Sequence, residues 1–326
     1  MSAARSRRSA PRTRQRGIAL LTAIILVAIA TIVATAIGWQ SQLSARRGIA
    51  VFTVEQSLAL AEGAEAIAAF ALSQNRQKNP QLIAPSQVWA QPFGPTEFAP
   101  GAVLEARLED LSGRFNLNSV VTQPKGGGPL SVDPVGKAEF EYLLQMLQID
   151  TTYAARLIDW IDADNQPTFP GGAEDSFYMA LSPPYRPPNM PITSISELLA
   201  MGMDRVSYDK LKNLVTALPP GTPVNVCTAP GEVLDALGQT TSYSTSPQQT
   251  LAQRQQYSCF PDVATFLAGV SPTQKGLVQG RVGTTSQYFR LRTWITIGTT
   301  RFTLYSLINQ TPSGQIRPLI RTFGTE

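Results

Sequence analysis

The chain begins with an apolar stretch that passes into an amphipathic helical pattern. Almost every side chain from Ile18 to Trp39 is apolar, and no charge occurs between Ile18 and Ala45. A helix of about 20 such residues crosses the hydrocarbon core of a membrane. Further apolar residues recur at steps of three and four, namely Ile49, Phe52, Leu58, Ala61, Ile67, Ala68, Ala71 and Leu72. This spacing predicts one continuous helix from Ile18 to about Gln77.

Alternation of apolar and polar residues indicates strands at both ends of the remaining chain. The alternating segments are Ala102–Asp110, Tyr288–Ile297, Arg301–Asn309 and Gln315–Phe323. The second and third of these are joined by a turn at Gly298, which predicts a hairpin. Pro318 suggests that the last segment lies at a sheet edge. The proline-rich stretch Asn79–Pro100 is expected to be a connector.

The middle of the chain, from about Val120 to Gly280, has helical periodicity. The amphipathic segments are Glu139–Gln148, Thr151–Ile161, Ser194–Met201, Ser207–Ala217 and Pro230–Leu237. A Ser/Thr/Gln-rich stretch, Thr240–Gln256, is expected to be a flexible loop. The combined pattern predicts an α+β fold, in which a long N-terminal helix packs on an antiparallel sheet and a large helical domain interrupts that sheet.

The distribution of charge gives an orientation rather than a nucleic-acid partner. The net charge is +4, and six arginines precede residue 18: Arg5, Arg7, Arg8, Arg12, Arg14 and Arg16. Without them the net charge is 4 − 6 = −2, so the body of the chain is mildly acidic. Nucleic-acid binding has no support from this balance. Basic residues before a membrane span hold that end in the cytoplasm, so the body is expected in the periplasm.

The chain contains no histidine, which excludes Ser-His-Asp catalysis and histidine-ligated metals. It contains two cysteines, Cys227 and Cys259, and they do not form a C-x-x-C motif. In an exported protein a single pair favours one disulfide, worth about 3–4 kcal/mol for a loop of this size. Two buried free thiols are the alternative.

Five acidic residues lie close together in a loop rich in proline and glycine: Asp159, Asp162, Asp164, Glu174 and Asp175. Carboxylates this crowded repel one another unless a cation or solvent separates them. Calcium takes oxygen ligands of this kind from flexible loops. Asp162 and Asp164 have EF-hand spacing, but Ala173 stands at the twelfth position, so that motif fails. The alternatives are a solvated acidic loop and a hydrolytic carboxylate pair.

The start of the apolar stretch admits two kinds of processing. A plain secretory signal would find a small-x-small cleavage site at Ala34–Ala36. However, the helical pattern continues far beyond that point. The basic leader ends in Gly17, directly before Ile18. This junction resembles the prepilin signal of the type IV pilin-like family, which implies cleavage by prepilin peptidase after Gly17 and methylation of Ile18.

Most members of that family carry a glutamate at the fifth mature position, whereas here that position is Thr22. In the family, the glutamate neutralises the N-terminal amine of the subunit that precedes it. A charge left unpaired in hydrocarbon costs several kcal/mol. A subunit with threonine at this position cannot neutralise the N-terminal amine of a preceding subunit. It has no such amine to neutralise if it is the first subunit to assemble. Among pseudopilins this absence points towards the K type.

The body of the chain resembles the K-type minor pseudopilins of type II secretion systems. The motifs that carry the resemblance are Leu111–Asn118, Asp159–Asp164, Gly172–Asp175 with Tyr178, and Ile192–Leu199. The resemblance implies a non-enzymatic subunit at the tip of the pseudopilus, anchored in the inner membrane. It also implies calcium in the acidic loop, and minor pseudopilins of types I and J as partners, with type H as a further candidate.

The expected organisation follows from these patterns. Residues 1–17 form the leader and residues 18–78 the membrane and assembly helix. Residues 79–119 and 281–326 form the pilin-like αβ domain, and residues 120–280 form the inserted helical domain. The rival interpretation is a signal-anchored periplasmic protein with a binding or hydrolytic function.

Overall fold

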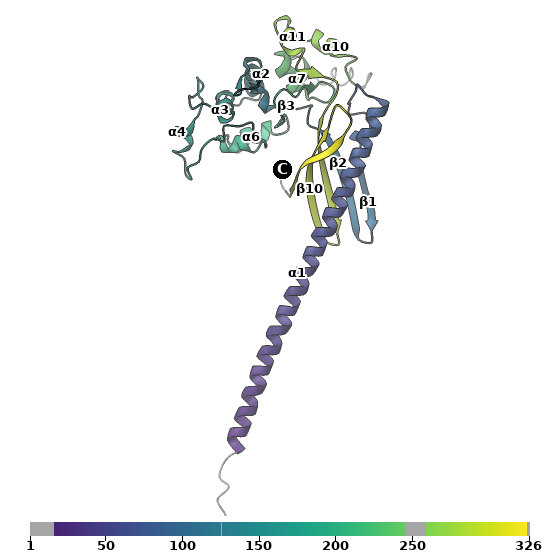
Figure 1. Cartoon of the computed structure of the whole chain (residues 1–326), viewed down its shortest axis with the longest axis vertical. Helices are drawn as coiled ribbons and strands as arrows, with labels where there is room; N and C mark the ends of the chain where they lie inside the picture. The colour runs from purple at the N-terminus through teal and green to yellow at the C-terminus, as the bar shows by residue number, and fades with distance from the viewer. Residues whose placement is uncertain (1–15, 125, 246–258, 325–326) are drawn as a thin grey trace, which may run out of the picture. The chain divides into compact units, whose positions relative to one another are not determined.

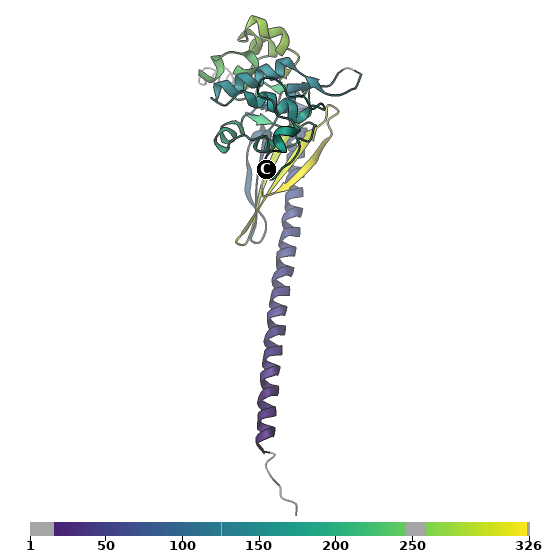
Figure 2. The same ribbon diagram turned by 90° about the vertical axis from the view of Figure 1, so that its left-hand side faces the viewer.

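The structure is a computed structural model and describes residues 16–124, 126–245 and 259–324 (Figures 1 and 2). The chain divides into two units, one ending at Leu58 and the other running from Ala59 to Glu326. Five of the leader arginines, from Arg5 to Arg14, lie outside the described residues. Helix α1 (Arg16–Lys78) begins in the first unit and ends in the second.

The first unit consists of the N-terminal part of α1. Its large apolar side chains are exposed in the isolated chain, with Ile18 at 68%. Thr22 does not interrupt the helix, because its hydroxyl donates a hydrogen bond to the carbonyl of Ala19 at 3.0 Å. Within the described part of the chain, α1 is the one helix long and apolar enough to cross a membrane. The predicted continuous helix is therefore confirmed, ending one residue beyond Gln77.

The second unit contains a five-stranded antiparallel sheet in the order β1-β2-β9-β10-β11. Its strands are β1 (Phe93–Ala99), β2 (Ala102–Asp110), β9 (Tyr288–Ile297), β10 (Thr300–Gln310) and β11 (Ile316–Phe323). The predicted bounds of β2 and β9 are confirmed. The expectation that Asn79–Pro100 is only a connector is wrong, because it contains β1 and the short helix η1 (Val88–Ala90). Pro95 is tolerated because β1 is an edge strand with irregular register.

One face of this sheet packs against the last turns of α1 (Figure 1). The helix contributes small side chains, which permit close approach, and the strands contribute alternate apolar residues. The buried members of this cluster are Ala61, Ala64, Ala68, Leu72, Ile83, Trp89, Leu104, Ala106, Leu108, Phe289, Leu291, Ile295, Leu304 and Ile308. Glu65 lies within the same face, where it accepts a hydrogen bond from Ser306 and pairs with Arg321 of the edge strand β11. The sheet is thus fixed to the helix by burial and by a charged pair.

The helical elements gather near one end of the sheet (Figures 1 and 2). The helices are η2 (Leu117–Val120), α2 (Pro134–Met146), α3 (Thr152–Ile161), α4 (Asp175–Tyr178), α5 (Glu197–Ala200), α6 (Arg205–Leu211), α7 (Gly231–Gly238), α8 (Ser242–Thr245), α10 (Val263–Ala268) and α11 (Pro272–Val278). Three short pairings accompany them: β3 (Phe115–Asn116) with β6 (Val215–Thr216), β4 (Val121–Thr122) with β5 (Ser131–Val132), and β7 (Val224–Asn225) with β8 (Val282–Gly283). The inserted helical region is therefore confirmed, although the limits 120–280 of a separate domain stay a prediction.

The predicted helix Ser207–Ala217 is too long at its C-terminal end. Helix α6 stops at Leu211, and β6 follows it in parallel pairing with β3. Asn116 provides the tertiary reason, because its side chain donates to the carbonyl of Pro219 and accepts from the amide of Leu218. Hydrogen bonds to a distant segment thus override the local helical pattern.

Cys227 and Cys259 form a disulfide, and both are fully buried. The disulfide prediction is confirmed, and the alternative of two free thiols is wrong. Most of the stretch expected to be a flexible loop, from residue 246 onwards, lies outside the described residues. The disulfide belongs to the larger core of the second unit, which also includes Phe140, Leu157 and Tyr178.

Asp110, at the end of β2, joins segments from three parts of the chain. Its carboxylate accepts hydrogen bonds from Asn225 at 3.1 Å and from Ser286 at 2.6 Å, and Thr228 also donates to it. Asn225 in turn donates to the carbonyl of Ile83 at 2.9 Å. These hydrogen bonds satisfy the buried carboxylate within the protein, so Asp110 holds the end of the sheet to β7.

Candidate metal centre

The acidic loop begins where α3 ends. The helix buries Leu157, Ile158 and Ile161 against the core, which leaves Asp159 and Asp162 in its last turn and directly after it. Asp162 has extended backbone geometry and terminates the helix. The local sequence therefore places two carboxylates at one helix end, as the pattern predicts.

The loop then folds back onto α3. The backbone amide of Thr168 donates to both carboxylate oxygens of Asp159, at 2.9 and 3.1 Å. Gly171 has a φ of +86°, which favours glycine, and a side chain at Gly172 would collide with the carboxylate of Asp159. This tight return brings Glu174, at the start of α4, towards Asp162.

Three carboxylates converge as a result. One oxygen from each of Asp162, Asp164 and Glu174 lies within 4.8 Å of the others. Asp162 is 8% exposed and Glu174 only 2% exposed, whereas Asp164 is exposed. Within the described chain, Asp162 Oδ1 and both carboxylate oxygens of Glu174 are buried without a hydrogen-bond partner. Buried acceptors of this kind are normally satisfied, so the cluster has a place for a donor or a cation.

The raised pKa values of Glu174 and Asp162 also favour a bound cation. Burial, together with the negative charges of Asp159, Asp162, Asp164 and Asp175, raises the pKa of Glu174 to about 7. Burial and the neighbouring Asp164 and Asp159 raise the pKa of Asp162 to about 6. Such groups resist ionisation unless positive charge is supplied. Because the oxygen atoms are hard ligands on a loop, a divalent cation such as calcium fits them.

The other two predicted acids do not belong to this group of three. Asp159 is fully buried and is bonded to Thr168, so it shapes the loop. Asp175 forms an ion pair with Arg186, with 3.5 Å between its Oδ2 and the arginine Nε. Sequence reasoning missed both Thr168 and Arg186, because neither contact follows from local spacing.

Trp160, which lies between the acids in the sequence, points into the core. Its indole nitrogen donates to Glu197 at 2.9 Å, and its ring meets that of Tyr178 edge to face at 5.2 Å. It is 5% exposed and cannot act as a platform for a ligand. Trp160 therefore belongs to the core of the second unit.

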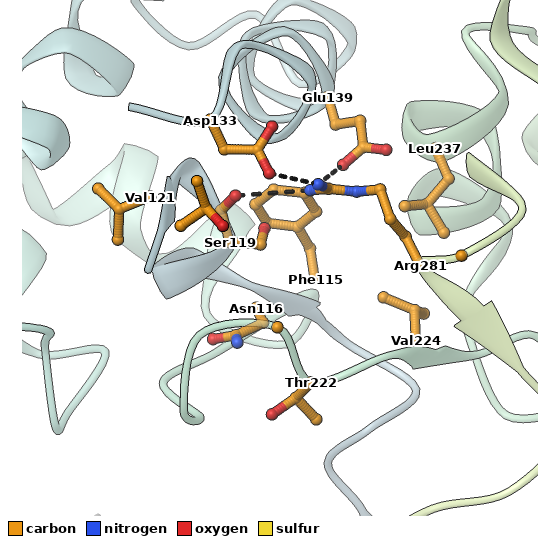
Figure 3. A pocket seen from close by; sticks show the side chains of 13 residues that line it. Phe115, Asn116, Ser119, Val121, Asp133, Glu139, Thr222, Val224, Leu237 and Arg281 are labelled. Carbon is orange, nitrogen blue, oxygen red and sulfur yellow. Dashed lines mark hydrogen bonds and ion pairs between the residues drawn. The ribbon is translucent and has the colours of Figure 1, made fainter. Parts of the chain in front are cut away.

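A second buried group of carboxylates provides a contrast (Figure 3). Asp133 and Glu139 of the α2 region both pair with Arg281, at 2.5 and 3.1 Å. A cavity of about 150 Å³ lies beside them, lined also by Phe115 and Thr222. Here the protein supplies its own cation, whereas Asp162, Asp164 and Glu174 have no such partner in the described residues. The difference favours an external cation at the acidic loop.

Replacing Arg281 with methionine is expected to destabilise the protein most at alkaline pH. Loss of the guanidinium leaves Glu139, which is 1% exposed, without its cationic partner, and removal of one partner of a largely buried pair costs about 2–3 kcal/mol at pH 8. Burial already raises the pKa of Glu139 to about 7. The pKa of Glu139 is thus higher in the folded state than its unfolded value of 4.5, so the folded state binds this proton more tightly. The free energy of unfolding therefore falls as the pH rises from 4.5 through about 7.

Urea denaturation of the Arg281→Met variant at pH 5.5 and pH 8 measures this difference. The matched control is Arg281→Met combined with Glu139→Gln, which should recover stability at pH 8 and lose most of the pH dependence. Equal losses at both pH values, with no recovery in the control, would contradict the assignment.

Comparison with known proteins decides the family. The description "Type II secretion system (T2SS), protein K" fits residues 113–220. The type II secretion system protein K of Pseudomonas aeruginosa is 32% identical over 322 residues, which cover 96% of this chain and 94% of that protein. The chain belongs to the type II secretion system protein K family. Its relative in Klebsiella pneumoniae is 34% identical over 66% of this chain and 67% of that protein.

A solved structure of the same family extends the match to three dimensions. It is the GspK–GspI–GspJ complex from the type 2 secretion system of enterotoxigenic Escherichia coli, with a TM-score of 0.74 and 30% identity. The match covers 86% of this chain and 100% of that chain. Protein K is a minor pseudopilin with a structural role, so the rival interpretation as a hydrolytic protein is wrong. The predicted pilin-like α+β fold is confirmed.

Proposed function

We propose that this chain is the tip subunit of the type II secretion pseudopilus and assembles there with minor pseudopilins of types I and J. The observation that carries the proposal is the likeness to a protein solved in complex with GspI and GspJ. Type H and the prepilin peptidase are the further expected partners. The body lies in the periplasm, and α1 spans the inner membrane with its arginine-rich leader in the cytoplasm.

Thr22 supports the position at the tip. Its hydroxyl is satisfied by the carbonyl of Ala19, so the residue adds no charge at membrane depth. The subunit therefore needs no amine from a preceding subunit, while its own amine at Ile18 remains available to the glutamate of the next one. The expected organisation into a leader, an assembly helix, a pilin-like domain and an inserted domain is part of this proposal.

Co-purification tests the assembly. The full-length chain, expressed with the types I and J pseudopilins of the same organism, should be recovered from detergent as one complex of the three. Separate elution of the chain at micromolar concentrations of all three proteins would contradict the proposal.

Replacing Gly17 with alanine is expected to abolish N-terminal processing. The prepilin-type junction requires the residue before the cut to be glycine, whereas an ordinary signal cleaved after Ala36 does not depend on position 17. Immunoblotting of membranes should show the Gly17→Ala chain only at its precursor mass. Replacement of Gly38 by alanine is the matched control, because a side chain there meets no atom within 4 Å. Normal maturation of Gly17→Ala would contradict cleavage after Gly17.

The acidic loop is proposed to bind calcium through Asp162, Asp164 and Glu174. Calcium accepts carboxylate and backbone oxygens at about 2.3–2.6 Å in flexible geometry. Asp159 and Asp175, each engaged with another group, would shape the site from its edge. The ion would neutralise the three converging carboxylates and hold the loop between α3 and α4. Its role is structural, and no chemical step is assigned to it.

A further inference from the structure

The face of the sheet opposite α1 carries an organised set of cationic and aromatic side chains. Arg292 lies over the rings of Trp294 and Tyr305, at 5.6 and 5.1 Å from their centroids. Arg301 also lies over the Trp294 ring, 5.6 Å from its centroid. Cation–π contacts of this kind hold long arginine side chains in place.

Strand register places a further arginine on the same face. Arg107 of β2 is opposite Arg292 of β9, which is opposite Tyr305 of β10. Side chains directly opposite one another in a sheet share a face. We call Arg107, Arg292, Trp294, Arg301 and Tyr305 the arginine–tryptophan face. The alternate residues of the same strands form the core under α1.

This face has an excess of positive charge. Glu105, opposite Trp294, and Glu97 of β1, opposite Val103, are acids that share the face by register. The nearby Glu109 is occupied by ion pairs with Arg114 and Arg290. Arg107 and Arg301 are exposed and form no ion pair in the described part of the chain. The combination of fixed arginine, tryptophan and tyrosine side chains is the composition of protein-binding hot spots.

An apolar groove continues from the arginine–tryptophan face. It has a volume of about 170 Å³ and is lined by Tyr305 together with Leu307, Ile320 and Ile195. Tyr305 therefore belongs both to the groove and to the arginine–tryptophan face. A groove of this size accepts one large apolar side chain beside a set of charge-paired contacts.

We propose that the arginine–tryptophan face docks an acidic surface of a folded protein from outside the pseudopilus. Carboxylates of that protein pair with Arg107 and Arg301, and an apolar side chain enters the groove beside Tyr305. The outward position rests on the proposed assembly, in which neighbouring subunits pack through their α1 helices. Positive charge with ordered aromatic rings selects a protein carrying Asp and Glu over a neutral one.

Site-specific cross-linking in secreting cells tests the proposal. Thr303, opposite Trp294 in the register, is replaced by photoreactive p-benzoylphenylalanine in the full-length chain expressed with its types I and J partners. The adduct is identified by mass spectrometry. We expect a protein joined through a segment rich in Asp and Glu, and an adduct yield about tenfold lower in the Arg107→Glu, Arg301→Glu variant.

Matched variants separate electrostatics from unfolding. Arg107→Gln with Arg301→Gln should give an intermediate yield, and Lys275→Glu, an exposed charge reversal on α11, should leave the yield unchanged. An adduct with lipid, an adduct with the type I or J subunit, no adduct, or a yield unaffected by charge reversal would each overturn the proposal. Co-purification with types I and J is measured on the same samples, so failure of the assembly itself is recognised independently.

Discussion

Removing calcium is expected to lower the melting temperature of the protein by roughly 5–10 °C. A ligand at about 100 times its Kd stabilises the folded state by about 2.7 kcal/mol, and each kcal/mol shifts the melting temperature of a chain of this size by roughly 2–4 °C. The physical reason is that Asp162 and Glu174 are buried with unpartnered oxygens, so the metal-free loop retains uncompensated repulsion. Differential scanning calorimetry with calcium and with EGTA measures the shift.

Variants of the acidic loop distinguish a bound ion from a solvated loop. Glu174→Gln removes one negative charge from the cluster, so the metal-free variant should melt at or above the temperature of the metal-free wild type. The same variant should no longer respond to calcium. Asp209→Asn is the control. Asp209 is an exposed acid of α6 that pairs with Lys212, and its replacement should leave the full calcium response. A wild-type protein that melts at one temperature with and without the ion would contradict the calcium site.

Loss of the disulfide is expected to reduce the free energy of unfolding by about 3–4 kcal/mol. Cys227 and Cys259 are separated by 32 positions, and the bridge restricts the unfolded chain over that loop. Both residues are fully buried in the core around Phe260 and Phe266, so their replacement also removes packing. Urea denaturation of the Cys227→Ala, Cys259→Ala variant should show the loss.

The wild-type protein in reducing agent is the matched comparison, because it lacks the bridge and keeps both sulfur atoms. Reduction should lower the free energy of unfolding of the wild-type protein by nearly as much as the double substitution does. If reduction leaves the unfolding midpoint unchanged while mass spectrometry confirms free thiols, the bridge does not stabilise the fold.

Strands and the long helix could be predicted from the sequence because each has a clear period. β2 alternates strictly in burial and β9 does so over most of its length, because one face of the sheet is buried under α1. The short elements could not be predicted in this way. β1 contains Pro95, and nearly all of its side chains are exposed, so it has no apolar alternation. It is a strand because it pairs with β2. The end of α6 depends on Asn116, which lies far away in the sequence.

The candidate site was only partly predictable for the same reason. Composition singled out five acids, but their distances depend on how the loop returns to α3. Thr168 fixes Asp159, and Arg186 pairs with Asp175, leaving Asp162, Asp164 and Glu174 to converge. The Arg281 cluster was missed because its acids lie more than 140 residues from the arginine in the chain. Contacts of that length leave no local pattern.

The most direct test of the proposed pseudopilin function is the N-terminal sequence and intact mass of the protein recovered from membranes. We expect a chain that begins at methylated Ile18, as required for an N-terminal amine that the next subunit can neutralise. A chain that begins at Ile37, or one that keeps its arginine-rich leader, would contradict pilin-type assembly of this protein.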